Sequence, residues 1–143
     1  MEGNSLVGTW QLLSHCIYDA SGQESYPYGK AVVGYATYTA TGYMSLTVAS
    51  DRRERFASID PVAARVGEWV AAAKTYLSYC GRYEIVAAQR MICQIEASLF
   101  PNWTGARQER YFQLQGDRLQ TSTPPLLQGG KLQTSQLNWK RVS

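Results

Sequence analysis

The chain is poor in the residues from which metal sites, disulfides and many catalytic sites are built. Its 143 residues include one histidine, His15, and three cysteines, Cys16, Cys80 and Cys93. The cysteines are widely spaced among apolar or small residues, which is typical of reduced thiols in a packed interior. No paired cysteine spacing accompanies the histidine, so the sequence predicts no zinc or other metal site and no disulfide.

Charge is scarce in any one place. The net charge is +3, and the one local concentration of arginines, Arg52, Arg53 and Arg55, is interrupted by Glu54. A net charge this small, without a basic patch, argues against nucleic-acid binding. The sequence has no glycine-rich phosphate loop before a helix and no Ser-His-Asp or Cys-His arrangement, so we expect no cofactor.

Long apolar runs are absent as well. No run approaches the roughly 20 apolar residues of a membrane span. The first residues, MEGNS, lack the basic and apolar regions of a secretory signal, which predicts a cytoplasmic protein. A chain of this length can bury enough surface to fold without disulfides or metals, and we expect one domain over residues 1–143.

Aromatic residues are plentiful, with ten tyrosines and four tryptophans. Their rings suit strand faces and pocket walls alike. Alternation of period two, broken by turn residues, recurs along the chain and predicts eight strands. The expected strands are 10–18, 33–39, 43–48, 81–86, 91–97, 107–114, 118–123 and 132–142.

One segment has helical periodicity instead. Asp60 precedes Pro61, the preferred order at a helix start, and an apolar stripe follows as far as Leu77. The sequence therefore predicts a helix over 61–77, between the expected third and fourth strands. Such a helix either caps a barrel mouth or packs on the outer wall, and the bulk of Trp69 and Tyr76 favours the cap.

The short polar turns between the expected strands favour antiparallel neighbours. The predicted fold is therefore all-β, an eight-stranded antiparallel up-and-down β-barrel with one inserted α-helix, because closure removes both unpaired sheet edges. Eight strands enclose a space that side chains can fill or that can hold one small ligand.

Several segments carry a likeness to a known family. They are LVGTW (6–10), SYPYG (25–29), GY (34–35) with TATGYM (39–44), RFAS (55–58), SLFPNW (98–103) and TSTPP (121–125). In them the chain resembles the short lipocalin-like domain proteins of bacteria and fungi. The resemblance implies a lipocalin-like, calycin-type barrel with a cavity, and it implies no particular reaction.

In the larger lipocalin group, the tryptophan of the first-strand motif seals the barrel base, and a basic residue of the last strand packs over it. The resemblance therefore implies that Trp10 closes this barrel with Arg141 over it, or with Lys140 as second choice. The alternative is that Trp10 is ordinary core and Arg141 is exposed.

Polar residues on partly apolar strands are the candidates for a site inside the barrel. Arg110 shares a strand face with Phe112, so it either snorkels at the rim or points inward with a partner such as Glu96 or Glu109. Glu96, Tyr83 and Arg110 are the catalytic candidates, which would assist proton movement or polarise a carbonyl. The candidate ligand-binding residues are Tyr35, Tyr38, Trp69, Tyr76, Tyr83, Glu96 and Arg110.

Each candidate has a structural alternative. The tyrosines are also typical of strand packing with the hydroxyl at the rim, and Glu96 also fits an ordinary surface position. On the strand parity set by Trp10, His15 points away from the barrel, which argues against a catalytic role. Asn102-Trp103-Thr104 matches a glycosylation sequon, but it is better interpreted as a loop in which Trp103 anchors the turn.

These patterns support a binding protein as the first hypothesis: a carrier or sensor of a small hydrophobic molecule held in the barrel. The second is a cofactor-free cyclase or isomerase acting on a polyketide-like or terpenoid-like compound of a natural-product pathway. The third is a filled barrel that acts through its tyrosine-rich surface, for example as a homodimer.

Overall fold

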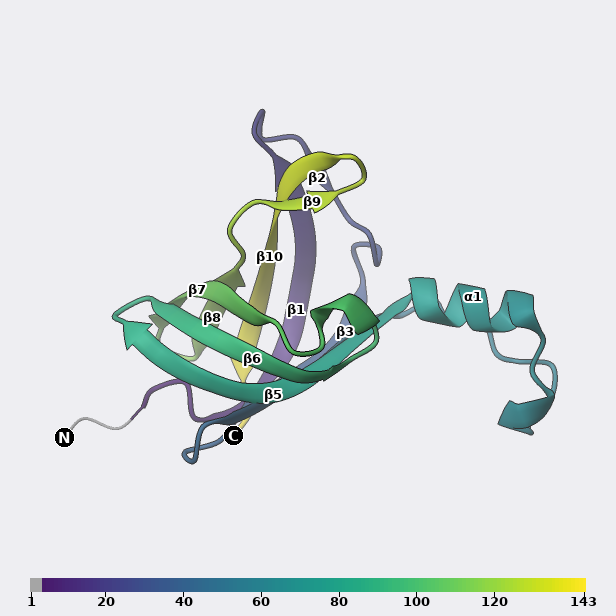
Figure 1. Ribbon diagram of the computed structural model, residues 1–143, viewed down its shortest axis with the longest axis horizontal. Helices are drawn as coiled ribbons and strands as arrows, with labels where there is room; N and C mark the ends of the chain where they lie inside the picture. The colour runs from purple at the N-terminus through teal and green to yellow at the C-terminus, as the bar shows by residue number, and fades with distance from the viewer. Residues whose placement is uncertain (1–3) are drawn as a thin grey trace.

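Antiparallel strands form one sheet that closes on itself, as Figure 1 shows for the computed structural model, which describes residues 4–143. The strands are β1 (Gly8–Asp19), β2 (Glu24–Ser25), β3 (Val32–Tyr38), β4 (Tyr43–Ser50), β5 (Tyr76–Ala87), β6 (Arg90–Ser98), β7 (Arg107–Gln115), β8 (Arg118–Ser122), β9 (Leu126–Gln128) and β10 (Lys131–Arg141). The helical segments are a 3₁₀ turn (Pro61–Ala63), the helix α1 (Val66–Lys74) and a second 3₁₀ turn (Pro101–Trp103).

Pairing between the first and last long strands closes the barrel. β1 pairs with β3 on one side and with β10 on the other, in a register that runs from Trp10 opposite Arg141 to Asp19 opposite Gln133. The short strands β2 and β9 lie outside the ring and pair with the far ends of β1 and β10. The remaining eight strands confirm the all-β, eight-stranded antiparallel barrel that the sequence predicts.

Strand alternation decides which side chains face the interior. On β6, Met91, Cys93 and Ile95 are buried while Gln94 and Glu96 are exposed. Period-two alternation of this kind places one face of each strand inside the barrel and the other in solvent. Most of the buried apolar side chains belong to one interior cluster.

Trp10 closes the end of the barrel at which β1 begins and β10 ends. Its ring is fully buried, and its indole N–H donates to the backbone oxygen of Leu6 at 3.0 Å. The guanidinium of Arg141 lies 4.2 Å from the ring centroid and donates to the backbone oxygens of Val7 at 2.8 Å and Ser5 at 2.6 Å. The indole and guanidinium are thus both satisfied within the protein, and Lys140 is exposed.

The glycine that precedes this tryptophan by two residues has a geometric role. Gly8 has a φ of 139°, and a Cβ there would lie 2.4 Å from the backbone oxygen of Ser143 and 2.7 Å from Nη1 of Arg141. A side chain at this position would therefore displace both the C-terminal backbone and the arginine that covers Trp10.

The predicted 61–77 helix is wrong in extent. Asp60 accepts a hydrogen bond from the backbone N–H of Val62 at 3.0 Å, but this cap starts only a three-residue 3₁₀ turn. The α-helix α1 ends at Lys74, and β5 begins at Tyr76 because Tyr76 and the following residue pair with β4. The strand pairing of these residues outweighs their place on the helical stripe.

Gly81, the first residue of the expected strand 81–86, lies within the longer strand β5. A Cβ at Gly81 would come within 2.0 Å of the backbone oxygen of Gln94. A register irregularity between β5 and β6 falls beside it, after Cys80. The glycine therefore allows two strand backbones to approach closely at a bulge.

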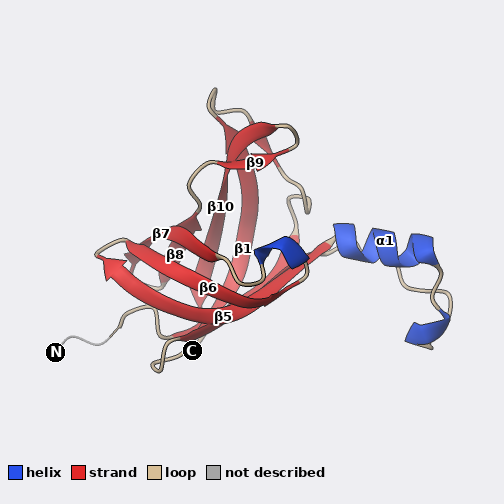
Figure 2. Cartoon of the chain, in the orientation of Figure 1, coloured by secondary structure: helices blue, strands red, loops and turns tan. Residues whose placement is uncertain are grey.

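The predicted cap over the barrel mouth is also wrong. Residues 51–75, which we call the arm, carry α1 away from the barrel, as Figures 1 and 2 show. The ring of Trp69 is 51% exposed and packs edge-on against Phe56 of the same arm, with ring centroids 4.9 Å apart. Arg53 holds the base of the arm, donating to Thr75 Oγ1 at 3.1 Å and to the Ala72 oxygen at 3.2 Å. These contacts hold Trp69 within the arm and away from the opening, and of the α1 residues Ala73, near the end of the helix, lines the cavity.

Candidate functional site

The barrel encloses a cavity of about 700 Å³ that opens to solvent at the end opposite Trp10. This volume falls within the range of small-molecule sites. Aliphatic and sulfur-containing side chains line much of it: Leu46, Val48, Leu77, Met91, Cys93, Leu99 and Leu137. The interior is therefore hollow above its sealed base, which the sequence left open as one of two outcomes.

Aromatic rings form the second part of the lining: Tyr28, Tyr38, Tyr76, Tyr79, Phe100 and Trp103. Trp103 lies in the 3₁₀ turn after β6 and contacts two other rings edge-on, Tyr79 at 5.8 Å and Phe100 at 5.6 Å between centroids. Edge-to-face contacts at these spacings hold aromatic rings in fixed relative orientations. One wall of the cavity is thus a rigid aromatic surface suited to a flat, apolar ligand.

Polar groups form the third part of the lining: His15, Gln108, Arg110, Thr121, Thr123, Gln128 and Ser135, with the neighbouring Ser122. His15 corrects the sequence analysis, which placed it outside. The β1–β10 register shifts between Leu12 and Ser14, where Leu13 forms a bulge. An extra residue in one strand reverses the parity beyond it, so Trp10 and His15 both face inward although they are five positions apart.

The imidazole of His15 is buried, with 6% of the residue exposed, and it lies edge-on to Tyr28 at 5.1 Å. Its Nδ1 has no hydrogen-bond partner among residues 4–143. Burial lowers the pKa of His15 to about 4, because desolvation disfavours the charged ring. The ring is therefore neutral at neutral pH, with one nitrogen as donor and the other as acceptor.

Arg110 is a buried basic side chain of the lining, with 6% of the residue exposed. It points inward from β7, beside the buried Phe112. Its guanidinium donates to the backbone oxygen of its neighbour Glu109 at 2.9 Å and to Oε1 of Gln108. The Glu109 carboxylate pairs instead with Arg90, at 3.8 Å, across the β6–β7 pair.

Three further polar side chains near Arg110 keep their protons. Burial raises the pKa of Tyr38 well above its usual value, and it raises the pKa of Tyr79 and of the Cys93 thiol, in each case against the opposing charge of Arg110. The Thr121 hydroxyl accepts a hydrogen bond from the Trp139 indole at 3.0 Å, which leaves its own O–H to donate. This part of the cavity therefore contains several groups that can donate a hydrogen bond to a ligand.

The other residues named from the sequence lie elsewhere. Tyr35 is half exposed on the outer face of β3, and Glu96 is exposed on the outer face of β6. Tyr83 is buried near the sealed end, where its hydroxyl donates to the Thr39 oxygen and accepts from Asn4, both at 2.7 Å. The cavity lining therefore brings together Tyr38, Tyr76 and Arg110 from the predicted set. Tyr35, Trp69, Tyr83 and Glu96 lie outside it.

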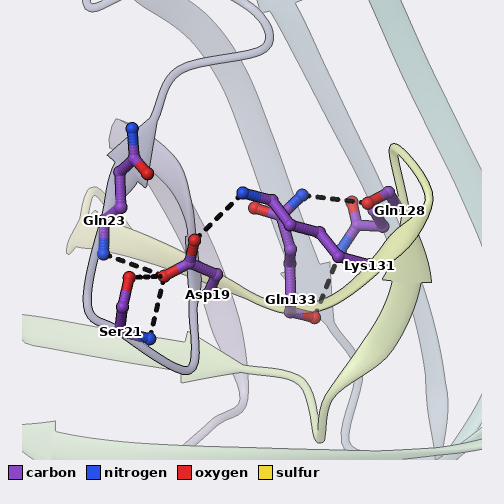
Figure 3. A network of polar contacts seen from close by, with 6 residues as sticks. All are labelled: Asp19, Ser21, Gln23, Gln128, Lys131 and Gln133. Atoms are coloured by element: carbon purple, nitrogen blue, oxygen red, sulfur yellow. Dashed lines mark hydrogen bonds and ion pairs between the residues drawn. The ribbon is translucent and has the colours of Figure 1, made fainter.

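A polar network braces the wall beyond the barrel ring, as Figure 3 shows. The Asp19 carboxylate accepts from the hydroxyl of Ser21 at 2.5 Å, from the backbone N–H of Gln23 at 3.1 Å and from Lys131 Nζ at 3.0 Å. These bonds, with Ser21 the largest contributor, lower the pKa of Asp19. They join the turn after β1 to the start of β10, next to the β9 residues that line the cavity.

Across residues 4–143, no three His, Cys, Asp or Glu side chains gather closely enough to hold a metal ion. The longest helix of this same part of the chain, α1, is too short to cross a membrane.

The pattern of the lipocalin-like domain family matches residues 7–142, from the LVGTW motif to the end of β10. The chain belongs to the lipocalin-like domain family. An Aspergillus oryzae protein named 4'-hydroxy-3'-methoxypropiophenone carrier protein ppsC is 36% identical to it over 83 residues, which cover 52% of this chain and 75% of the relative. These matches confirm the resemblance drawn from the sequence segments.

Several lining residues of this lipocalin-like barrel escaped the sequence analysis, among them His15, Tyr28, Tyr79, Phe100 and Trp103. The aromatic SLFPNW segment carried a usable signal, because two rings flanking a proline turn beside a strand can form a pocket wall. His15 carried none, since a bulge has no distinct mark in the local alternation.

Proposed function

We propose that the protein binds one small, mainly apolar molecule in the barrel cavity and acts as its carrier or sensor. The observation that carries the proposal is the cavity of about 700 Å³, which is lined by a rigid aromatic wall and a few inward polar groups. Apolar ligand surface buried there contributes about 25 cal/mol per Å². The polar groups would fix the orientation of the ligand.

The relative supports a carrier role. Its name assigns it a ligand with an aromatic ring, a hydroxyl, a methoxy group and a ketone. A molecule of that kind matches the ring-lined wall and the donors near Arg110 in chemical character. We propose an aromatic, oxygen-bearing ligand for this chain as well.

A blocked cavity tests the proposal. Leu46 faces inward and Ser45, its neighbour on β4, faces solvent. We expect wild-type protein to raise the fluorescence of the neutral dye Nile red, Leu46→Trp to weaken dye binding at least tenfold, and Ser45→Trp to leave it unchanged. Equal binding by all three proteins would place the dye outside the barrel and reject the proposal.

A cofactor-free cyclase or isomerase is the second candidate. The cavity contains one group of each type that such a reaction needs. Neutral His15 can accept a proton, protonated Tyr79 can donate one, and Arg110 can polarise a carbonyl. Glu96 and Tyr83 no longer support this candidate, because they lie outside the cavity. Recovery of bound ligands for mass and NMR analysis separates the two functions: a carrier returns its ligand unchanged, and an isomerase or cyclase does not.

The cytoplasmic location and the homodimer stay predictions from the sequence.

A further inference from the structure

Arg110 and Arg141 face different surroundings. Arg141 is partly exposed at the sealed end, where it stacks on Trp10 and donates to two backbone oxygens. Arg110 is enclosed in the cavity wall, where its guanidinium donates to the Glu109 backbone oxygen and to Gln108 Oε1 and also interacts with the Tyr79 hydroxyl. These partners are all neutral, and a guanidinium has five N–H groups.

No carboxylate balances this buried charge within the described part of the chain. The cavity lining contains no Asp or Glu, and His15 is neutral at neutral pH, so Arg110 carries the formal charge of the lining in residues 4–143. The neighbouring Glu109 pairs with Arg90 instead. Burying a cation without a counter-charge destabilises a protein, and an apolar residue of similar size is often neutral or stabilising in its place.

The groups around Arg110 point to the same ligand chemistry. Tyr38, Tyr79 and Thr121 offer O–H donors to the cavity, so an oxygen placed beside the guanidinium can accept several hydrogen bonds. A negatively charged oxygen uses such a cluster best, because charge-assisted bonds are about twice as strong as neutral ones.

We propose that the ligand carries an anionic oxygen group, a carboxylate or an ionised phenol, which enters the cavity and pairs with Arg110. The inference rests on the proposed binding function and adds the charge of the ligand to it. The bound molecule supplies the counter-charge that the lining lacks, while its apolar body lies against the aromatic wall.

Matched ligand pairs test the charge. We expect calorimetry to show that wild-type protein binds naphthalene-2-carboxylate at least tenfold more tightly than the neutral naphthalene-2-carboxamide. A second pair, 4-hydroxyacetophenone and its methyl ether, distinguishes the source of the charge: affinity for the phenol rises with pH through the ionisation of the phenol, and affinity for the ether does not. Preference in the first pair alone assigns a carboxylate, and preference in the second alone assigns a phenolate.

Variants test the assignment to Arg110. Arg110→Gln should bind the carboxylate and the amide equally, while Arg110→Lys should keep part of the preference. Arg82→Gln, on the outer face of β5, is the matched control and should behave as wild type. If Arg110→Gln does not fold, the wild-type preference and the Arg110→Lys result decide the question.

The two proposals fail differently. Equal affinity for the charged and neutral members of both ligand pairs overturns the proposal that an anionic group pairs with Arg110. A preference for the charged member that survives in Arg110→Gln does the same. Either result leaves the proposal of cavity binding intact. If none of the four ligands and no Nile red binds to the wild-type protein, the proposed binding function itself is rejected.

Discussion

The two ends of this barrel use similar residues for opposite purposes. At the sealed end, the guanidinium of Arg141 stacks on the fully buried ring of Trp10, and both side chains donate hydrogen bonds to the surrounding backbone. At the open end, aromatic rings pack into one wall of a cavity, where His15 Nδ1 has no hydrogen-bond partner in residues 4–143 and the Arg110 guanidinium has N–H groups beyond those bonded to Glu109 and Gln108. Polar groups whose hydrogen bonds are all satisfied within the protein stabilise a fold, whereas unpaired polar groups in a cavity are available to a ligand.

The largest expected effect is at the sealed end. Trp10→Ala should lower the free energy of unfolding by about 3–5 kcal/mol, because a large buried ring is replaced by a void and the guanidinium of Arg141 loses its partner. Denaturant titration measures the change. A loss below about 1 kcal/mol would show that the indole does not close the barrel.

The pH dependence of stability sharpens the comparison at the open end. The pKa of His15 is about 4 in the folded protein and near 6.5 when unfolded, so the unfolded chain takes up the proton first. The contribution of neutral His15 to the free energy of unfolding is therefore complete above pH 6.5 and is lost as the pH falls toward 4. The total loss is about 3 kcal/mol.

His15→Gln isolates this contribution, because the chain has no other histidine. Unfolding measured between pH 7.5 and pH 4 should fall less steeply in the variant than in wild type. Identical slopes would mean that His15 takes up its proton over the same pH range in the folded and the unfolded chain.

The two arginines offer a direct contrast. Arg141→Gln should cost about 2 kcal/mol of stability through its cation–π contact and its hydrogen bonds, with ligand affinity unchanged. Arg110→Gln should change stability less than this and ligand selectivity more. Parallel denaturant and calorimetric titrations of both variants provide the measurement, and an equal loss of stability in both would erase the distinction between the two ends.

The smallest effect is expected on the arm. Trp69→Ala should change the free energy of unfolding by less than about 0.5 kcal/mol, because the half-exposed ring contacts Phe56 of the same arm. Nile red affinity should also stay the same. A weaker affinity in this variant would show that Trp69 contacts the ligand in solution, against its place in the structure.

Much of the fold was readable from local pattern. The alternation on 91–97 predicted a strand with Met91, Cys93 and Ile95 on one face, and β6 has that arrangement. The helix boundary was not readable, because Tyr76 continues the apolar stripe of the arm and also suits a strand. Its pairing with Ala49 of β4 decided the matter, and that pairing depends on a residue 27 positions earlier in the chain.

The sequence alone therefore determined the strand order and the barrel class, since these follow from short-range alternation and turns, while the tryptophan–arginine pair at the sealed end was implied by the family resemblance. Only the tertiary structure decided which polar side chains share the cavity. A bulge at Leu13, set by the pairing of β1 with β10, turned His15 inward. The absence of a carboxylate beside Arg110 in the described chain reflects the orientation of strands that are distant in sequence. The burial of a side chain depends on contacts with residues from the whole barrel, so it cannot be predicted from the period-two alternation of a single strand.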